Sequence, residues 1–126
     1  MSNFSDFFPV AGTSWVTAIQ TGNFTAVAGE GYFVNTTSAA ITVTLPVGVV
    51  GTEIVIQDYA GTFATNKVII EANGSEKIQG TTKDGELTTN NSTATLIYQD
   101  STQGWTSQDV TLIEQTLSVD FLIVAG

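Results

Sequence analysis

Two nearby stretches decide the fold: ITVTLP at residues 41–46 and EIVIQD at residues 53–58. In the first, apolar residues alternate with threonine, and alternation with a period of two is typical of a strand with one buried face. Pro46 ends this strand because proline has no N–H for the ladder of backbone hydrogen bonds. In the second, Ile54 and Ile56 fall on one face. Both stretches are therefore predicted to be half-buried strands.

The same alternation recurs in residues 94–98, and the many threonines, valines and isoleucines favour strands because branched Cβ atoms suit a pleated sheet. Helical spacing occurs only in residues 110–117, which we interpret as a strand or short turn. No exact internal repeat is visible. Turn signals separate the strands at Gly22-Asn23, Gly29-Glu30-Gly31, Gly48 to Gly51, Ala60-Gly61, Asn73-Gly74, Asp84-Gly85, Asn90-Asn91 and Gln103-Gly104. Short strands at this spacing predict an all-β chain, a small antiparallel β-sandwich or barrel-like domain.

The composition excludes several classes of function. The 126 residues contain no histidine and no cysteine, which excludes thiol chemistry and the usual zinc sites. Three lysines without arginine, in a chain of net charge −9, cannot form the basic stripe that nucleic acid or anionic lipid requires. The apolar fraction of 42% nevertheless predicts a folded domain. Without disulfides, its stability must come from a core or from association with other chains.

Four carboxylates are the best candidates for acid–base chemistry or calcium binding: Asp58, Asp84, Glu86 and Asp100. They lack the ordered ligand spacing of a calcium loop. Nothing in the sequence places two of them at the separation that glycan cleavage requires. We therefore predict no catalytic residue, metal site or cofactor, and we expect that the protein is not an enzyme.

The central part of the chain resembles a β-structured module that recurs in bacteriophage tail fibres and related virion proteins. The resemblance covers about three fifths of the chain and contains no catalytic signature. It rests on Tyr32-Phe33-Val34, Ile41 to Pro46, Gly51 to Asp58, Ala60-Gly61, Val68-Ile69-Ile70, Gly74 to Gly80, Ala94 to Tyr98 and Gly104-Trp105.

The resemblance implies a virion structural protein, a tail fibre or fibre-like component that attaches to the particle and presents or forms a host-adsorption element. Such modules are commonly homotrimers, so the expected partners are two further copies and other virion proteins, with a host surface glycan or protein left open. Because no signal peptide or membrane span is visible, we expect synthesis in the host cytoplasm and then assembly into the virion. The residues expected to form structural turns and core are Gly51, Asp58, Gly61, Gly74, Ile78, Gly80 and Trp105.

Both termini lie outside this resemblance. Residues 1–15 are interpreted as an aromatic attachment segment, residues 16–110 as the β-sandwich fibre module, and residues 111–126 as a C-terminal strand that leads into a longer fibre. The last eight residues resemble the opening of a glycine-rich region in some phage adhesins. The N-terminal aromatics either cover the edge of the core or insert into a neighbouring subunit. The predicted assembly residues are Phe4, Phe7, Phe8, Phe121, Leu122, Ile123 and Val124.

Two other functions stay open from the sequence. A capsid head fibre or decoration protein would share the β domain and the trimeric state. A stand-alone carbohydrate-binding module would instead use exposed aromatic rings, and we expect packing rather than sugar contact for most of them, above all Tyr98 and Trp105. The aromatic residues considered are Trp15, Tyr32, Phe33, Tyr59, Phe63, Tyr98 and Trp105.

Overall fold

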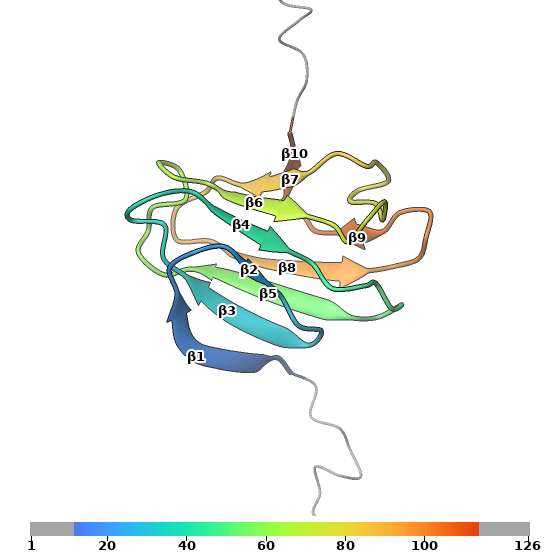
Figure 1. Cartoon of the computed structure of the whole chain (residues 1–126), viewed down its shortest axis with the longest axis horizontal. Helices are drawn as coiled ribbons and strands as arrows, with labels where there is room; N and C mark the ends of the chain where they lie inside the picture. The colour runs from blue at the N-terminus through green and yellow to red at the C-terminus, as the bar shows by residue number, and fades with distance from the viewer. Residues whose placement is uncertain (1–11, 114–126) are drawn as a thin grey trace, which may run out of the picture.

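The computed structural model of the chain describes residues 12–113, which form ten strands in two five-stranded sheets and contain no helix. Strands β1 and β10 lie at opposite ends of the molecule (Figure 1). The first sheet has the order β1-β3-β5-β8-β9, with bounds Ser14–Gln20, Glu30–Val34, Glu53–Asp58, Thr93–Tyr98 and Trp105–Thr106. The second has the order β10-β7-β6-β4-β2, with bounds Thr111–Leu112, Gly85–Leu87, Val68–Glu71, Ile41–Thr44 and Phe24–Thr25.

From β1 to β6 the chain alternates between the two sheets, so that each pair of successive strands forms one turn of a coil. Strands β1, β3 and β5 are parallel neighbours in the first sheet, and β2, β4 and β6 are parallel neighbours in the second. Tyr32 stands beside Ile56 in one ladder, and Val43 stands beside Ile70 in the other. The remaining strands, β7 to β10, join the sheets in antiparallel pairings.

The predicted all-β sandwich is confirmed, but the expected antiparallel pairing is wrong for four of the eight strand pairs. The reason is the route of the chain, which crosses to the other sheet after each early strand instead of folding back as a hairpin. The sequence held one signal of the parallel pairing, the continuous apolar run Ile54-Val55-Ile56, and all three residues are buried in β5. A continuous apolar run is typical of a parallel strand that is covered on both faces.

The core lies between the two sheets and follows the alternation predicted from the sequence. In β4 and β8 every second residue is buried, and the residues between them are half-buried or exposed. Full burial of a Val, Leu, Ile or Phe side chain stabilises the fold by roughly 1.5–3 kcal/mol. The largest side chains with under 2% exposure are Trp105, Phe63, Leu45, Ile54, Ile56, Ile70, Ile78, Leu87 and Leu96.

The glycines expected in structural turns have positive backbone φ angles. The values are 90° at Gly51, 73° at Gly61, 56° at Gly74 and 79° at Gly80. A side chain in this left-handed region is disfavoured, which explains glycine at these turns. The two expected core residues, Ile78 and Trp105, are 1% and 0% exposed.

The expected turn at Asp84-Gly85 is wrong, because Gly85 begins β7 and is buried. Glycine is needed there for packing, since a Cβ at this position would lie 2.4 Å from Cγ1 of Val110. Strand β10 bears out the expectation of a strand at the start of residues 110–117. The predicted assembly residues lie outside the described residues, in 1–11 and 114–126. The two sheets extend from Ser14 to Leu112, so they reach beyond residues 16 and 110, the expected limits of the module, at both ends.

Candidate functional site

The four candidate carboxylates serve separate structural contacts. Glu86 of β7 forms an ion pair with Lys67, with 3.2 Å between Nζ and Oε2. Oδ1 of Asp100 accepts backbone hydrogen bonds within the turn between β8 and β9. Asp84 lies in the loop before β7. Among residues 12–113, no group of three or more acidic side chains is placed to hold a metal ion, and no helix is long enough to span a membrane.

Asp58, the fourth carboxylate, is 3% exposed and holds two loops together. Its Oδ1 accepts hydrogen bonds from the N–H groups of Gly61 at 2.9 Å and Thr62 at 3.1 Å. Its Oδ2 accepts from the N–H groups of Phe63 at 3.2 Å and Asn91 at 2.9 Å. The first three donors follow β5, whereas Asn91 precedes β8. Since four backbone donors already occupy this carboxylate, we assign it a structural role.

Most of the aromatic rings considered as sugar platforms are in the core. The packing expected for Tyr98 and Trp105 is confirmed by exposures of 8% and 0%, and their ring centroids lie 5.4 Å apart in an edge-to-face arrangement. Phe63 is also fully buried. Trp15 and Tyr59 differ, with 38% and 55% exposure. These two are the most exposed of the aromatic residues considered, and Phe33 is half-buried.

Tyr32 has the one strongly perturbed ionisable group among the described residues. Burial, followed by the hydrogen bond that its hydroxyl donates to Glu30, raises the pKa of Tyr32 to about 12. The hydroxyl lies 2.7 Å from Oε1 of Glu30 and accepts a 2.7 Å hydrogen bond from the N–H of Val27. A phenol that ionises only near pH 12 cannot act as a base near neutral pH, so this network joins the start of β3 to the loop before it.

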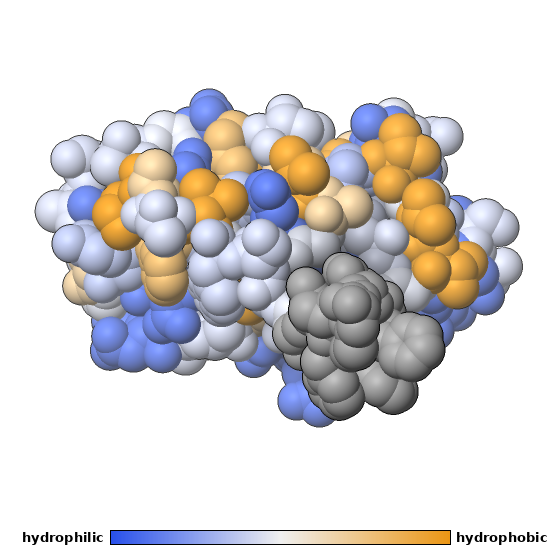
Figure 2. All heavy atoms as spheres, turned by 90° about the horizontal axis from the view of Figure 1, so that it is seen from below, coloured by the Kyte–Doolittle hydropathy of each residue, from blue (hydrophilic) through white to orange (hydrophobic). Residues whose placement is uncertain are grey.

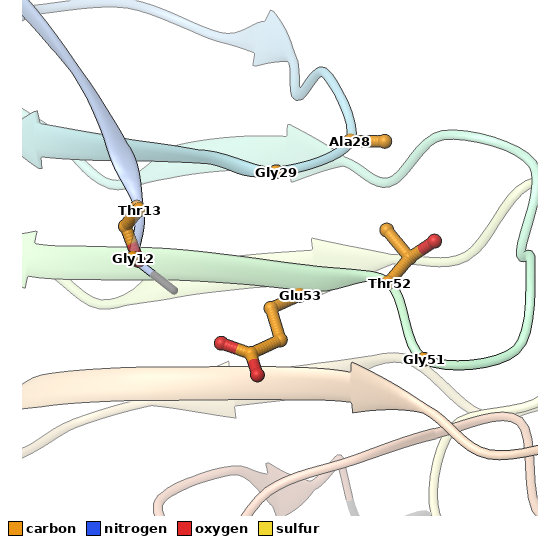
Figure 3. A pocket seen from close by; sticks show the side chains of 7 residues that line it. All are labelled: Gly12, Thr13, Ala28, Gly29, Gly51, Thr52 and Glu53. Carbon is orange, nitrogen blue, oxygen red and sulfur yellow. The ribbon is translucent and has the colours of Figure 1, made fainter. Parts of the chain in front are cut away.

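One hollow on the described surface is open and poorly equipped for chemistry. It has a volume of about 610 Å³ and is lined by Gly12, Thr13, Ala28, Gly29, Gly51, Thr52 and Glu53. In Figure 3 the Glu53 carboxylate lies at one side, and the other polar side chains come only from two threonines. One carboxylate without a partner cannot supply the acid and the base of a hydrolytic reaction.

The outer face of the first sheet is the most distinctive surface of the molecule. We call it the neutral face and define it by five outward-facing residues: Trp15, Phe33, Val55, Thr95 and Ile97. The ladder aligns Trp15 of β1 with Gly31, Val55 and Thr95 on the next three strands. The rings of Trp15 and Phe33 stack with 4.8 Å between centroids and 17° between planes.

Gly31 leaves the space that the Trp15 ring occupies. A Cβ at Gly31 would lie 2.9 Å from Cε3 of Trp15, so any side chain there would displace the indole. The next residue in the row, Val55, is only 6% exposed although it is on an outer face, whereas Ile97 is 39% exposed. The neutral face is therefore partly closed by its own aromatic pair and is open toward β8.

Two outward-facing polar residues beside the neutral face, Thr93 and Gln57, are bonded to each other. Oγ1 of Thr93 donates a 2.6 Å hydrogen bond to Oε1 of Gln57, which stands beside it in the ladder. Within residues 12–113, Glu53 at the rim is the one charged residue among the outward positions on β3, β5 and β8. The outer face of the second sheet is different, because it holds Glu71 and the Lys67–Glu86 ion pair.

A second group of apolar side chains lies at the end of the sandwich. Figure 2 looks onto the end where β1 lies and shows apolar groups separated by polar ones. The group at the right of this view is where Figure 1 shows the loop between β4 and β5. Three valines of this loop are well exposed: Val47 at 61%, Val49 at 63% and Val50 at 70%. They form a loop patch rather than a continuation of the sheet surface.

Sequence reasoning considered Trp15 and Phe33 singly and missed the surface that they form together. The parallel pairing of β1 with β3 brings them together, and this pairing was not predicted. One signal was available: residues 14–20 contain no charged residue and no proline, which is unusual for a strand at the edge of a sheet.

Comparison with known proteins gave no match: no protein-family model fits the sequence, and no curated protein aligns with it significantly.

Proposed function

We propose that this protein is a non-enzymatic structural component of a bacteriophage virion, a tail fibre or fibre-like subunit that attaches to the particle and serves host adsorption. The observation that carries the proposal is the neutral face, five uncharged and mostly apolar residues with Glu53 at the rim, on a chain of net charge −9. Surfaces that combine aromatic residues with few charges are typical of protein contacts. The resemblance of the central residues to the fibre module supplies the choice of particle.

The arrangement of the carboxylates supports a structural role. Asp58 and Glu86 are engaged in contacts within the fold, and the hollow beside Glu53 offers a single carboxylate. The expectation that the protein is not an enzyme is therefore kept as part of the proposal. A compact sandwich whose polar groups stabilise its own loops is suited to presenting a surface of fixed shape.

The test is to locate the chain on purified particles. Mass spectrometry of density-purified virions should detect the chain in a fixed proportion to the major capsid protein, and gold-labelled antibody should decorate the tail. Label on the head would instead support the capsid fibre or decoration protein. Recovery of the chain only in the soluble fraction of the lysate, with none on particles, would refute the proposal.

A carbohydrate-binding module is the second candidate, and Trp15 favours it. The indole is 38% exposed and backed by Phe33, an arrangement in which a flat ring is available for stacking on a sugar. On this alternative, Trp15→Ala abolishes binding to host-surface glycans, measured by calorimetry, and leaves the fold intact. Equal glycan binding by the native chain and the variant, or none by either, would remove this candidate.

A further inference from the structure

We propose that the neutral face is the surface through which copies of this chain associate with one another. The inference deepens the proposed function, because it names the partner and the residues for the homo-oligomer that a fibre subunit requires. Its accessible centre is formed by Trp15, Thr95 and Ile97, with Phe33 half-buried beside Trp15 and Val55, at 6% exposure, as the floor between them.

Charge is the first argument for a second copy as the occupant. Two chains of net charge −9 repel each other through most of their surfaces. Acidic residues lie on the outer face of the second sheet and in the loops, including Glu71, Asp84 and Asp109. Association through the neutral face brings together the part of each copy that carries the least charge and holds the acidic parts away from one another.

The polar chemistry of the face favours protein contact over glycan contact. Recognition of a sugar needs polar groups that are free to bond hydroxyls. Beside this face Oγ1 of Thr93 donates to Oε1 of Gln57 at 2.6 Å, and among the five residues of the face only Thr95 and the indole N–H of Trp15 carry polar side-chain atoms. The face therefore offers mainly apolar and threonine side chains, which suit the interior of an interface between proteins.

The edge of the sheet gives an independent argument. Among residues 12–113, β1 pairs with β3 alone, and no described strand lies on its other side. Natural edge strands are commonly protected by charge or proline, and β1 has neither over its seven residues. The unprotected edge adjoins the neutral face at Trp15. Both features are consistent with a surface that is covered when copies assemble, and point-group symmetry allows each copy to use the same face.

The test compares two matched lysine variants of the full chain by light scattering coupled to size-exclusion chromatography over a dilution series. Thr95→Lys places a cation in the middle of the neutral face, whereas Val50→Lys places one on the exposed loop patch, at 70% exposure. Both lower the net negative charge by one, so an unspecific charge effect would favour association equally in both. Burying an unpaired charge in the interface should raise the dissociation constant of Thr95→Lys at least about 100-fold.

We expect the molar mass of the native chain and of Val50→Lys to be a multiple of 13.3 kDa, which is three times that mass for a trimer. We expect Thr95→Lys to have the molar mass of a monomer. Because Thr95 is exposed, the variant should still fold and keep the β-sheet circular dichroism spectrum of the native chain. Trp15→Ala provides a second variant, with weaker association and no added charge. A monomeric native chain, or unchanged association in both face variants, would overturn the inference.

Failure of this inference and failure of the proposed function can be distinguished. If Thr95→Lys remains oligomeric but the chain is found on virions, the face is wrong and the function stands. If Thr95→Lys dissociates but no particle contains the chain, the face is correct and the function is wrong. Retained glycan binding in Thr95→Lys together with loss in Trp15→Ala, in a monomeric native chain, would assign the face to a sugar instead.

Discussion

The two halves of the described chain build the same pair of sheets by different routes. From β1 to β6 the chain coils, and each turn adds one parallel strand to each sheet. From β7 to β10 it adds antiparallel strands that complete both sheets. Both halves contribute large buried rings, Phe63 and Tyr32 in the coiled half and Trp105 and Tyr98 in the second half. They differ in arrangement: the coiled half aligns aliphatic side chains in register, such as Val43 beside Ile70, whereas in the second half Trp105 packs edge to face against Tyr98.

The largest expected effect tests this difference at Trp105. Replacing its fully buried indole with alanine should lower the free energy of unfolding by about 3–5 kcal/mol, because a large cavity forms beside Tyr98. In the coiled half, Ile70→Val should cost only about 0.5–1.5 kcal/mol, because one methyl group is lost from one layer. Urea denaturation of the purified variants measures both values.

A variant with phenylalanine sharpens the same comparison. Nε1 of Trp105 is buried and has no hydrogen-bond acceptor among the described residues. Trp105→Phe removes this unpaired donor together with part of the ring, so it should cost clearly less than Trp105→Ala. If Trp105→Ala were as mild as Ile70→Val, the second half would not depend on its large aromatic side chain.

The sequence predicted the strands well because their signal is local. Alternation alone placed Ile41, Val43 and Leu45 on the buried face, and it placed Ile97 on the outside. It could not predict which strands are neighbours, because the turns of the coil differ in length: residue 14 pairs with residue 30, but residue 31 pairs with residue 55. Unequal turns leave no repeat for sequence analysis to detect.

The candidate surface depends on that missing information. Trp15 and Phe33 are 18 positions apart in the sequence and stack only because β1 and β3 are parallel neighbours. Likewise, Asp58 accepts a hydrogen bond from the N–H of Asn91, although β6 and β7 of the second sheet separate the two residues in the sequence. The absence of cysteine can be read from the residue types alone, whereas a surface formed by strand pairing requires the topology.

Asp58 connects the two halves, and its replacement should have the second largest effect. Asp58→Asn removes the charge and turns an amide N–H₂ group toward two of the four backbone donors, those of Phe63 and Asn91 or those of Gly61 and Thr62. Hydrogen bonds to a charged group contribute roughly 1.5–3 kcal/mol, so we expect a loss of about 2–3 kcal/mol in urea denaturation.

The matched control for Asp58 is Asp100→Asn, since Asp100 also accepts two backbone hydrogen bonds but is exposed in a turn of the second half. It should cost about 1 kcal/mol or less. Hydrogen exchange then reports where the damage occurs: in Asp58→Asn the two amides of one pair, either Phe63 and Asn91 or Gly61 and Thr62, should lose protection together. Loss at only one of them would contradict the role of Asp58 in joining the halves.

Within the coiled half, the raised pKa of Tyr32 predicts that the stability of the fold falls at alkaline pH. Its pKa of about 12 in the folded chain is above the ordinary value of 10.0, so folding favours the neutral phenol. This contribution is fully present below pH 10 and is lost as the pH rises from 10 toward 12. The free energy of unfolding should therefore fall more steeply over that range in the native chain than in Tyr32→Phe.

The Tyr32→Phe variant should also lose about 1 kcal/mol at pH 8, because Glu30 and the N–H of Val27 lose their partner. Tyr59→Phe is the control, since Tyr59 is 55% exposed and its hydroxyl can remain hydrated. Parallel alkaline slopes for the native chain and Tyr32→Phe would show that the Tyr32 phenol does not contribute to this pH dependence.

The smallest expected effect is at the Lys67–Glu86 ion pair, which connects β7 of the second half to the residue before β6 of the first. The lysine side chain is 42% exposed, and ion pairs in contact with water contribute about 0–1 kcal/mol. Lys67→Met should therefore change the free energy of unfolding by less than about 1 kcal/mol, and any loss should shrink further in high salt because the charges are screened. A loss as large as that of Asp58→Asn, independent of salt, would mean that surface charge rather than the buried carboxylate joins the two halves.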